Sequence, residues 1–160
     1  MGAFSSTEAC ELPDLSIDVN LSEDAELPMY ETPGRGGMAL YASADTTLCA
    51  GEKGPVPTGV AVRLPFMLIG MVVSEARARI EIATRVVDFD STSPIVLEAT
   101  YRPTTVEEPD TIEIKKGEKL GMLVILPIAR PGLSVARPAR NDDEAVVTPA
   151  RKDATKHERA

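Results

Sequence analysis

The sequence TIEIKKGEKLGMLVILPI, residues 111–128, decides the fold of this chain. Ile112 and Ile114 alternate with charged or polar residues, which is typical of a strand with one exposed face. The tripeptide Lys116-Gly117-Glu118 then indicates a turn, and a nearly unbroken apolar run follows from Leu120 to Ile128. Together these features predict a β-hairpin.

The second arm of this predicted hairpin has no polar face. Leu120, Met122 and Val124 lie on one side of an extended chain, and Leu123 and Ile125 lie on the other. A strand with two apolar faces needs an apolar partner on each side. A second sheet of the same chain can cover one face, and we expect the next subunit of an oligomer to cover the other.

The composition of the chain favours short β-strands over helices. Its 160 residues suffice for one domain with tails, and such a domain can enclose a core without metal ions or disulfides. The hydrophobic content is 43% with only 4% aromatic residues, and 13 prolines and 11 glycines break the chain into short elements. Because few segments keep a helical period, we predict an all-β sandwich or barrel.

The order of apolar and turn segments predicts about ten short strands, as in a jelly roll. We expect these strands at residues 15–21, 38–44, 46–49, 60–64, 68–73, 80–87 and 95–101, followed by the two arms of the hairpin. Three regions are expected: an acidic N-terminal arm over 1–26, a β domain over 27–130, and a tail over 131–160 that is rich in Pro, Ala and Arg.

The charge of the chain restricts its partners. The net charge of −8 argues against direct nucleic-acid binding, because phosphate contact requires clustered Lys and Arg. Every charged side chain between Met1 and Thr32 is acidic. We interpret this segment as a solvated arm, with contact to a basic surface of another subunit or protein as the alternative.

Other features predict an intracellular, reduced protein without a cofactor. We recognise no secretory signal, and no apolar run reaches the ~18 residues of a membrane span. Cys10 and Cys49 lack the spacing of a metal site, so two buried thiols are expected, with a disulfide as the alternative. His157, the only histidine, lies in the charged tail, and Gly34 to Gly37 is interpreted as a turn and not as a phosphate cradle.

Three segments in order, LPMYETPGRGGMALYASADTTLCAGEKGPVPTGVAVRLP, VVDFD and IEIKKGEKLGMLVILPI, resemble the deoxyuridine triphosphatase (dUTPase) family. The resemblance covers residues 27–128. It implies a jelly-roll-like β-barrel of the β-clip type that assembles into a homotrimer with active sites between subunits. This agrees with the two-sided apolar arm inferred from the residues alone.

The motifs that hold metal and triphosphate in that family differ in this chain. Ala39 stands where the first motif has a carboxylate that helps to place magnesium, and a methyl group cannot bind a metal. Glu75 and Ala76 stand where the second motif has Arg and Ser, so a repelling charge replaces a phosphate-binding one. Met122 stands where the fourth motif has a Gln that contacts phosphate, and the Gly-rich fifth motif is missing after Arg130.

The third motif is partly kept. The resemblance makes Asp88 the carboxylate that activates the attacking water, with Asp90 nearby. However, Ser91 stands where a Tyr packs under the sugar, and Thr84-Arg85 replaces a Gly-rich approach to the pocket. Since Asp88 alone cannot supply a complete site, we interpret it as a solvated or turn-capping residue and predict a pseudoenzyme with no dUTP hydrolysis, no catalytic residue and no metal site.

The first functional hypothesis is therefore a non-catalytic, homotrimeric structural or binding protein. A trimer suits a three-fold lattice position, and genes of the family are common in large DNA viruses and phages. We accordingly expect a capsid decoration (cement) or minor virion protein that binds a major capsid protein. Its predicted location is the capsid surface of a virion if the protein is viral, and the cytoplasm otherwise.

The second hypothesis keeps nucleotide recognition. It describes a nucleotide-binding regulator, or a divergent dUTP or nucleotide diphosphatase. Alternating arginines on a strand can meet phosphates, although Glu75 and Glu81 interleave with them and also fit a salt-linked strand face. The residues of such a rebuilt pocket are Arg77, Arg79, Arg85, Asp88 and Asp90.

Overall fold

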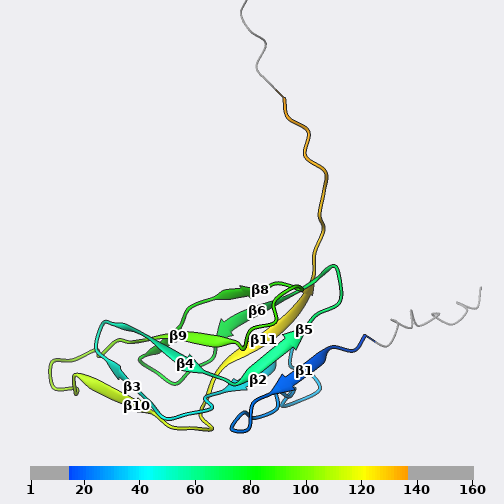
Figure 1. The fold of residues 1–160 in the computed structure, drawn as a ribbon. Coiled ribbons are helices and arrows are strands. Elements are labelled where there is room, and N and C mark those ends of the chain that lie inside the picture. Colours follow the sequence, from blue (N-terminus) through cyan, green and yellow to red (C-terminus); the bar gives the residue numbers. More distant parts are fainter. Residues whose placement is uncertain (1–14, 137–160) are drawn as a thin grey trace, which may run out of the picture. The chain divides into compact units, whose positions relative to one another are not determined.

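The computed structural model describes residues 15–136, and its regular structure in that range consists of eleven strands without a helix (Figure 1). The strands are β1 (Asp18–Leu21), β2 (Met38–Tyr41), β3 (Thr46–Cys49), β4 (Lys53–Pro57), β5 (Val60–Arg63), β6 (Leu68–Ser74), β7 (Ile80–Ile82), β8 (Arg85–Val87), β9 (Val96–Tyr101), β10 (Thr111–Ile114) and β11 (Lys119–Pro127). The predicted all-β class is confirmed. With no helix in this range, no helical membrane span occurs there.

The strands form four antiparallel sheets around one core. The largest has the order β2-β11-β6-β8, a second has the order β4-β9-β7, and two pairs consist of β1 with β5 and β3 with β10. Because these sheets are separate within the described residues, the predicted barrel is not closed. Side chains from all four sheets are almost fully buried in the core: Leu40, Leu48, Val56, Val60, Val72, Leu97, Ile114 and Leu123.

The predicted hairpin of residues 111–128 is wrong. β10 pairs with β3, whereas β11 lies between β2 and β6. The turn after β10 instead contacts the loop after β2, because the backbone N–H of Gly117 donates to the Ala42 carbonyl and that of Lys116 donates to the Asp45 carboxylate. The segments 38–49 and 111–127 therefore run antiparallel and cross together from one sheet into the next (Figure 1).

Two other strands differ from the sequence expectation. The apolar run 80–87 is not one strand, because Ala83 and Thr84 interrupt it and send β7 and β8 into different sheets. β4, over Lys53–Pro57, lies between the predicted strands 46–49 and 60–64, where the sequence predicts no strand. Its Pro55 and Pro57 are tolerated since β4 is an edge strand that pairs only with β9.

The terminal regions are partly described. Within the predicted N-terminal arm, β1 pairs with β5 over Asp18–Leu21. Cys49 is a free, exposed thiol, so its expected burial is wrong; alternation along β3 buries Leu48 and turns Cys49 outward. Cys10 and His157 lie outside the described residues, as does most of the predicted tail.

The four-stranded sheet has two apolar faces, as predicted for β11. The predicted place of Leu120 beside Met122 and Val124 is wrong, because the register shifts between Lys119 and Gly121 and Leu120 is buried in the core. The inner face of the sheet lies in the core. On its outer face, Met122 lies opposite Val73 on β6, Val124 lies opposite Met71, and Met71 lies opposite Val86 on β8. Along β6 and β11, the outer side chains are only half-buried, and Val86 is 50% exposed. We call these five residues the outer face.

Candidate functional site

The Asp88 turn follows β8 directly. The Ser91 backbone N–H donates to the Asp88 carbonyl at 3.1 Å, which closes a turn over residues 88–91. Phe89 packs against the core, whereas Asp88 and Asp90 are exposed. Within residues 15–136, neither carboxylate has a hydrogen-bond or ion-pair partner. Asp88 is therefore a solvated carboxylate and does not cap its own turn.

A cavity of about 270 Å³ lies at the other end of β8, lined by Ala83, Thr84, Arg85 and Glu98. The Ala83 backbone N–H donates to the Glu98 carbonyl at 2.9 Å, which fixes the turn between β7 and β8. At ~3.3 Å per residue along a strand, Asp88 lies about 10 Å from Arg85. The segment Thr84-Arg85, which the resemblance matches with a Gly-rich approach to the pocket, thus lines a cavity at the opposite end of β8 from Asp88.

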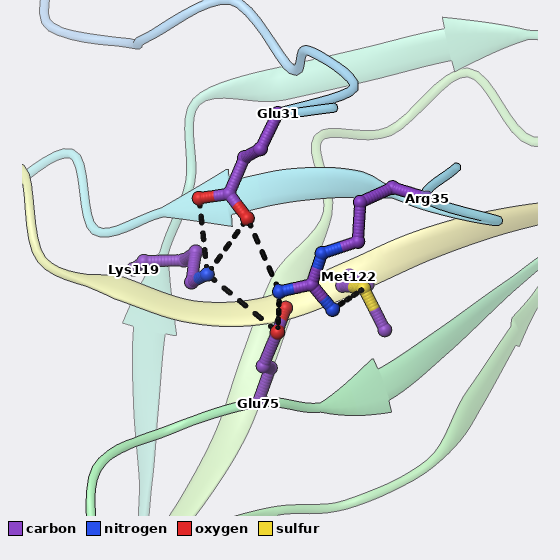
Figure 2. Close-up of polar contacts among 5 residues, drawn as sticks. All are labelled: Glu31, Arg35, Glu75, Lys119 and Met122. Atoms are coloured by element: carbon purple, nitrogen blue, oxygen red, sulfur yellow. Dashed lines mark hydrogen bonds and ion pairs between the residues drawn. The ribbon is translucent and has the colours of Figure 1, made fainter. Parts of the chain in front are cut away.

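A second polar cluster contains Glu31, Arg35, Glu75, Lys119 and Met122 (Figure 2). Arg35 Nη2 lies 2.5 Å from Glu75 Oε1 and 3.3 Å from Glu31 Oε2. Lys119 Nζ lies 2.9 Å from Glu31 Oε2 and 3.6 Å from Glu75 Oε1. Each carboxylate therefore contacts both cations. We call this set the Arg35 cluster.

The backbone brings these residues together from three places. Arg35 lies in the loop before β2, where its N–H donates to the Thr32 carbonyl at 3.1 Å. Glu75 follows β6, and its N–H donates to the Leu120 carbonyl at 3.0 Å. Lys119 and Met122 belong to β11, which lies between β2 and β6. The cluster thus lies where the central strand meets both of its neighbours.

The charges of the Arg35 cluster influence one another. The hydrogen bond from Lys119 lowers the pKa of Glu31 and raises the pKa of Lys119 itself. Two carboxylates and two cations give the cluster a formal charge near zero. The two carboxylate oxygens of Glu75 differ in their contacts. Oε1 contacts both cations, whereas Oε2 is buried and has no hydrogen-bond partner within the described chain.

The structure brings together only some of the motif positions. Glu75 and Met122 both contact Arg35, Ala76 follows Glu75, and Ala39 pairs with Met122 across β2 and β11. Asp88 is far from this group. The pairing of Val87 with Gly70 places Asp88 near the start of β6, whereas Glu75 follows its end, about 20 Å away at ~3.3 Å per residue.

A magnesium ion of the kind that the resemblance implies does not fit the residues present. Ala39 is 1% exposed and offers only a methyl group. The two nearby carboxylates, Glu31 and Glu75, are already paired with cations. No group of three or more His, Cys, Asp or Glu that could hold a metal occurs among the described residues. Oxygen ligands for a magnesium ion are therefore lacking at the first-motif position.

The three arginines of the second hypothesis do not form one cluster. Arg77 pairs with Glu118 at 3.4 Å, and Arg79 pairs with Glu108 at 2.8 Å. Arg85 Nη1 donates to the Val96 carbonyl at 3.4 Å. Glu81 forms an ion pair with Arg102, at 3.0 Å. This supports the alternative of a salt-linked surface, and leaves Arg85 beside the cavity.

Sequence reasoning missed three members of the Arg35 cluster. Gly34 to Gly37 was interpreted as a turn, and Arg35 does lie in a turned loop, but its side chain reaches Glu75. The available signal was a reversal of charge. The chain has an acid where the resemblance expects the second-motif arginine, and an unassigned arginine only 40 residues upstream. Glu31 and Lys119 had no recognisable signal.

Comparisons with known proteins identify relatives by sequence, although no protein-family model matches the chain. The deoxyuridine 5'-triphosphate nucleotidohydrolase of Mycolicibacterium vanbaalenii is 26% identical over 128 residues, covering 76% of this chain and 80% of that protein. The enzyme of the same name from an Anaeromyxobacter species is 33% identical over 117 residues, covering 69% and 76%. The one from Shewanella oneidensis is 32% identical over 123 residues, covering 71% and 78%.

Solved phage structures have the same fold. The dUTPase from phage phi11 of S. aureus gives a TM-score of 0.67 at 21% identity, covering 79% of this chain and 99% of that one. The dUTPase of Staphylococcus bacteriophage 80alpha gives a TM-score of 0.68 at 21% identity, covering 77% and 97%. These likenesses confirm the predicted dUTPase-like, jelly-roll-like fold.

The same comparisons correct the predicted function. The relatives named above are nucleotidohydrolases, which are enzymes, and this contradicts the prediction of a pseudoenzyme. The prediction of a pseudoenzyme took the residues at Ala39, Glu75 and Met122 as evidence for a loss of all activity. None of these relatives is described as a capsid protein, so the predicted capsid role gains no support.

Proposed function

This chain belongs to the deoxyuridine triphosphatase (dUTPase) family, and on that basis we propose that it hydrolyses a nucleoside triphosphate, with dUTP as the first candidate. Asp88 acts as the general base. The single observation that carries this role is the exposed carboxylate of Asp88, which keeps the third-motif position and has no internal partner within residues 15–136. A carboxylate that is not engaged elsewhere can accept a hydrogen bond, and then a proton, from water.

The proposed reaction is a displacement at phosphorus. Asp88 orients a water molecule and takes its proton while the water oxygen forms a bond to phosphorus. The bridging P–O bond breaks, and the leaving phosphate oxygen departs with the electron pair. The cavity at Ala83, Thr84, Arg85 and Glu98 is the proposed contact for the nucleoside, because β8 links it directly to Asp88. No step is assigned to a metal ion.

The proposed enzyme is a homotrimer, as the resemblance implies. Two observations support self-association. The outer face of the four-stranded sheet is apolar and only half-buried in the isolated chain. In addition, Asp88 and Glu75 lie at opposite ends of β6, so the third-motif and second-motif positions can meet only if different copies supply them.

The experiment that tests this function follows pyrophosphate release from dUTP, and from the other deoxynucleoside triphosphates, by the purified full-length chain. We expect turnover by the wild type and a loss of at least ~100-fold in Asp88→Asn, which removes the base. Asp90→Asn is the matched control, since it removes a second exposed carboxylate from the same turn. Turnover that is absent for every nucleotide, or unchanged in Asp88→Asn, would contradict the proposal.

A further inference from the structure

The guanidinium of Arg35 is incompletely paired. Nη2 contacts both carboxylates of its cluster, but Nη1 reaches only the sulfur of Met122, at 3.9 Å (Figure 2). A thioether is a weak acceptor, and a guanidinium binds best through two parallel N–H donors to one anion. Arg35 therefore keeps donor capacity that neither Glu31 nor Glu75 uses. Its side chain is 38% exposed, so an anion from solvent can reach it.

Glu75 is also poorly satisfied. Its Oε1 contacts Arg35 and Lys119, but its buried Oε2 has no hydrogen-bond partner within the described chain. A buried carboxylate oxygen without a donor destabilises the arrangement that contains it. Displacing Glu75 from Arg35 therefore costs less than displacing a carboxylate whose two oxygens are both bonded.

The two cations are already arranged around shared anions. Glu31 contacts Lys119 Nζ at 2.9 Å and Arg35 Nη2 at 3.3 Å, and Glu75 contacts the same two groups. Since one carboxylate can bridge both cations, a phosphate group can do so too. It offers three acceptor oxygens, and its geometry matches the fork of an arginine.

We propose that Arg35 and Lys119 form a phosphate-binding site that Glu75 and Glu31 occupy when no external anion is bound. Arg35 thereby supplies, from the loop before β2, a guanidinium at the place where the chain has Glu75 on the segment after β6. The identification of the bound group as a phosphate of the nucleotide substrate rests on the proposed function. The binding of an inorganic polyphosphate does not depend on that function.

The charge of the Arg35 cluster determines how Glu75 affects phosphate binding. Two cations and two carboxylates are neutral together, so an incoming phosphate must compete with Glu75 and Glu31. Replacing Glu75 with the neutral, isosteric Gln leaves a net positive charge and removes the competitor. An acidic side chain in the site thus weakens binding, and its removal strengthens binding, which is the opposite of the effect expected for a residue that helps to hold the ligand.

The test is calorimetric titration of the full-length protein with inorganic tripolyphosphate. We expect Glu75→Gln to bind about 10-fold more tightly than the wild type, which corresponds to ~1.4 kcal/mol. Arg35→Gln should bind more weakly than the wild type, and the double variant should lose the gain of Glu75→Gln. Arg77→Gln is the matched control, because it removes an equal charge from an arginine that pairs with Glu118 outside the cluster. Its affinity should stay within about 2-fold of the wild type.

The outcomes separate this inference from the proposed function. Equal affinities of the wild type and Glu75→Gln, or a gain that persists without Arg35, would overturn the phosphate site. If Glu75→Gln does not fold, as judged by circular dichroism, Glu31→Gln must show the gain instead. Failure of dUTP hydrolysis together with the expected tripolyphosphate affinities would reject the enzyme and retain the site. Hydrolysis that depends on Asp88, together with equal tripolyphosphate affinities of the wild type and Glu75→Gln, would retain the enzyme and reject the site.

Discussion

The ring of Phe66 stands edge-on to the ring of Phe89, with centroids 5.4 Å apart and planes at 85°. Phe66 belongs to the turn between β5 and β6, which is closed by a hydrogen bond from the Leu68 N–H to the Pro65 carbonyl. Phe89 lies between the two carboxylates of the Asp88 turn. Since aromatic pairs favour this arrangement, the contact joins the β5–β6 turn to Phe89, the residue that follows the proposed base Asp88.

We predict that Phe66→Ala loosens the Asp88 turn. The free energy of unfolding should fall by about 1 kcal/mol through loss of the ring contact. The Ser91 amide, which donates to the Asp88 carbonyl, should exchange its hydrogen faster. Hydrogen exchange followed by NMR measures this effect. Val106→Ala, at a fully exposed position in another loop, is the control. Unchanged exchange at Ser91 would mean that Phe66 does not support the turn.

We predict that the outer face of the four-stranded sheet holds the subunits together. The wild type should have three times the 17.1 kDa mass of one chain in light scattering after gel filtration. Met71→Glu should reduce this to the mass of a single chain, because Met71 lies between Val124 and Val86 and a charge there cannot be buried without a partner. Val106→Glu should leave the assembly intact. A wild type that elutes as a single chain contradicts the role of this face.

The positions of the strands could be predicted from the sequence better than the pairing between them. Alternation and apolar runs located β10 and β11, because the period of a strand is a local property. Their pairing is not local. β10 pairs with β3, and Ile114 is fully buried there, which depends on segments more than 60 residues away. A turn signal shows that the chain reverses direction, but it does not show whether the two arms stay in one sheet.

The difference between local and non-local signals also applies to the candidate site. The Asp88 turn was located from sequence, since DFDSTS carries its own turn residues. The Arg35 cluster was not, because Arg35 and Glu75 meet only after β2, β11 and β6 have paired. Motif comparison took Glu75 as a lost arginine, and the structure supplies an arginine from another segment at the same place. A substituted motif position is therefore insufficient evidence for lost binding.

The Glu31–Lys119 pair should make stability depend on pH in the acid range. The hydrogen bond from Lys119 lowers the pKa of Glu31 below its usual value of 4.5. Because folding lowers this pKa, the carboxylate stabilises the folded state above pH 4.5 and loses that contribution as the pH falls through the lower, folded value. Glu31→Gln should therefore melt below the wild type at neutral pH, and the difference should shrink near pH 3.

Melting curves from pH 3 to pH 7, followed by circular dichroism, measure this dependence. Glu107→Gln is the control, since it removes an exposed carboxylate outside the cluster. A difference between Glu31→Gln and the wild type that stays constant over this range would show that the pair does not contribute through its charge.

Two glycines with positive φ should separate backbone strain from steric overlap. Gly51 has φ +78 and an added Cβ would meet nothing within 4 Å, whereas Gly59 has φ +66 and its Cβ would lie 2.1 Å from Ser22 Oγ and 2.8 Å from Ala25 Cβ. Gly51→Ala should cost about 1 kcal/mol of unfolding free energy, because only the left-handed conformation opposes the methyl group. Gly59→Ala should cost about 3 kcal/mol, since the methyl must also displace the loop after β1.

The loop after β1 provides a second measurement that distinguishes Gly59→Ala from Gly51→Ala. The Ser22 N–H donates to the Gly59 carbonyl at 2.9 Å, next to the pairing of β1 with β5. Displacing Ser22 should therefore loosen β1 before the rest of the fold, and amide exchange at Asn20 should accelerate in Gly59→Ala and not in Gly51→Ala. Chemical denaturation gives the two free energies. Equal losses in the two variants would show that the contact between residues 22–25 and Gly59 is not rigid enough to resist a methyl group.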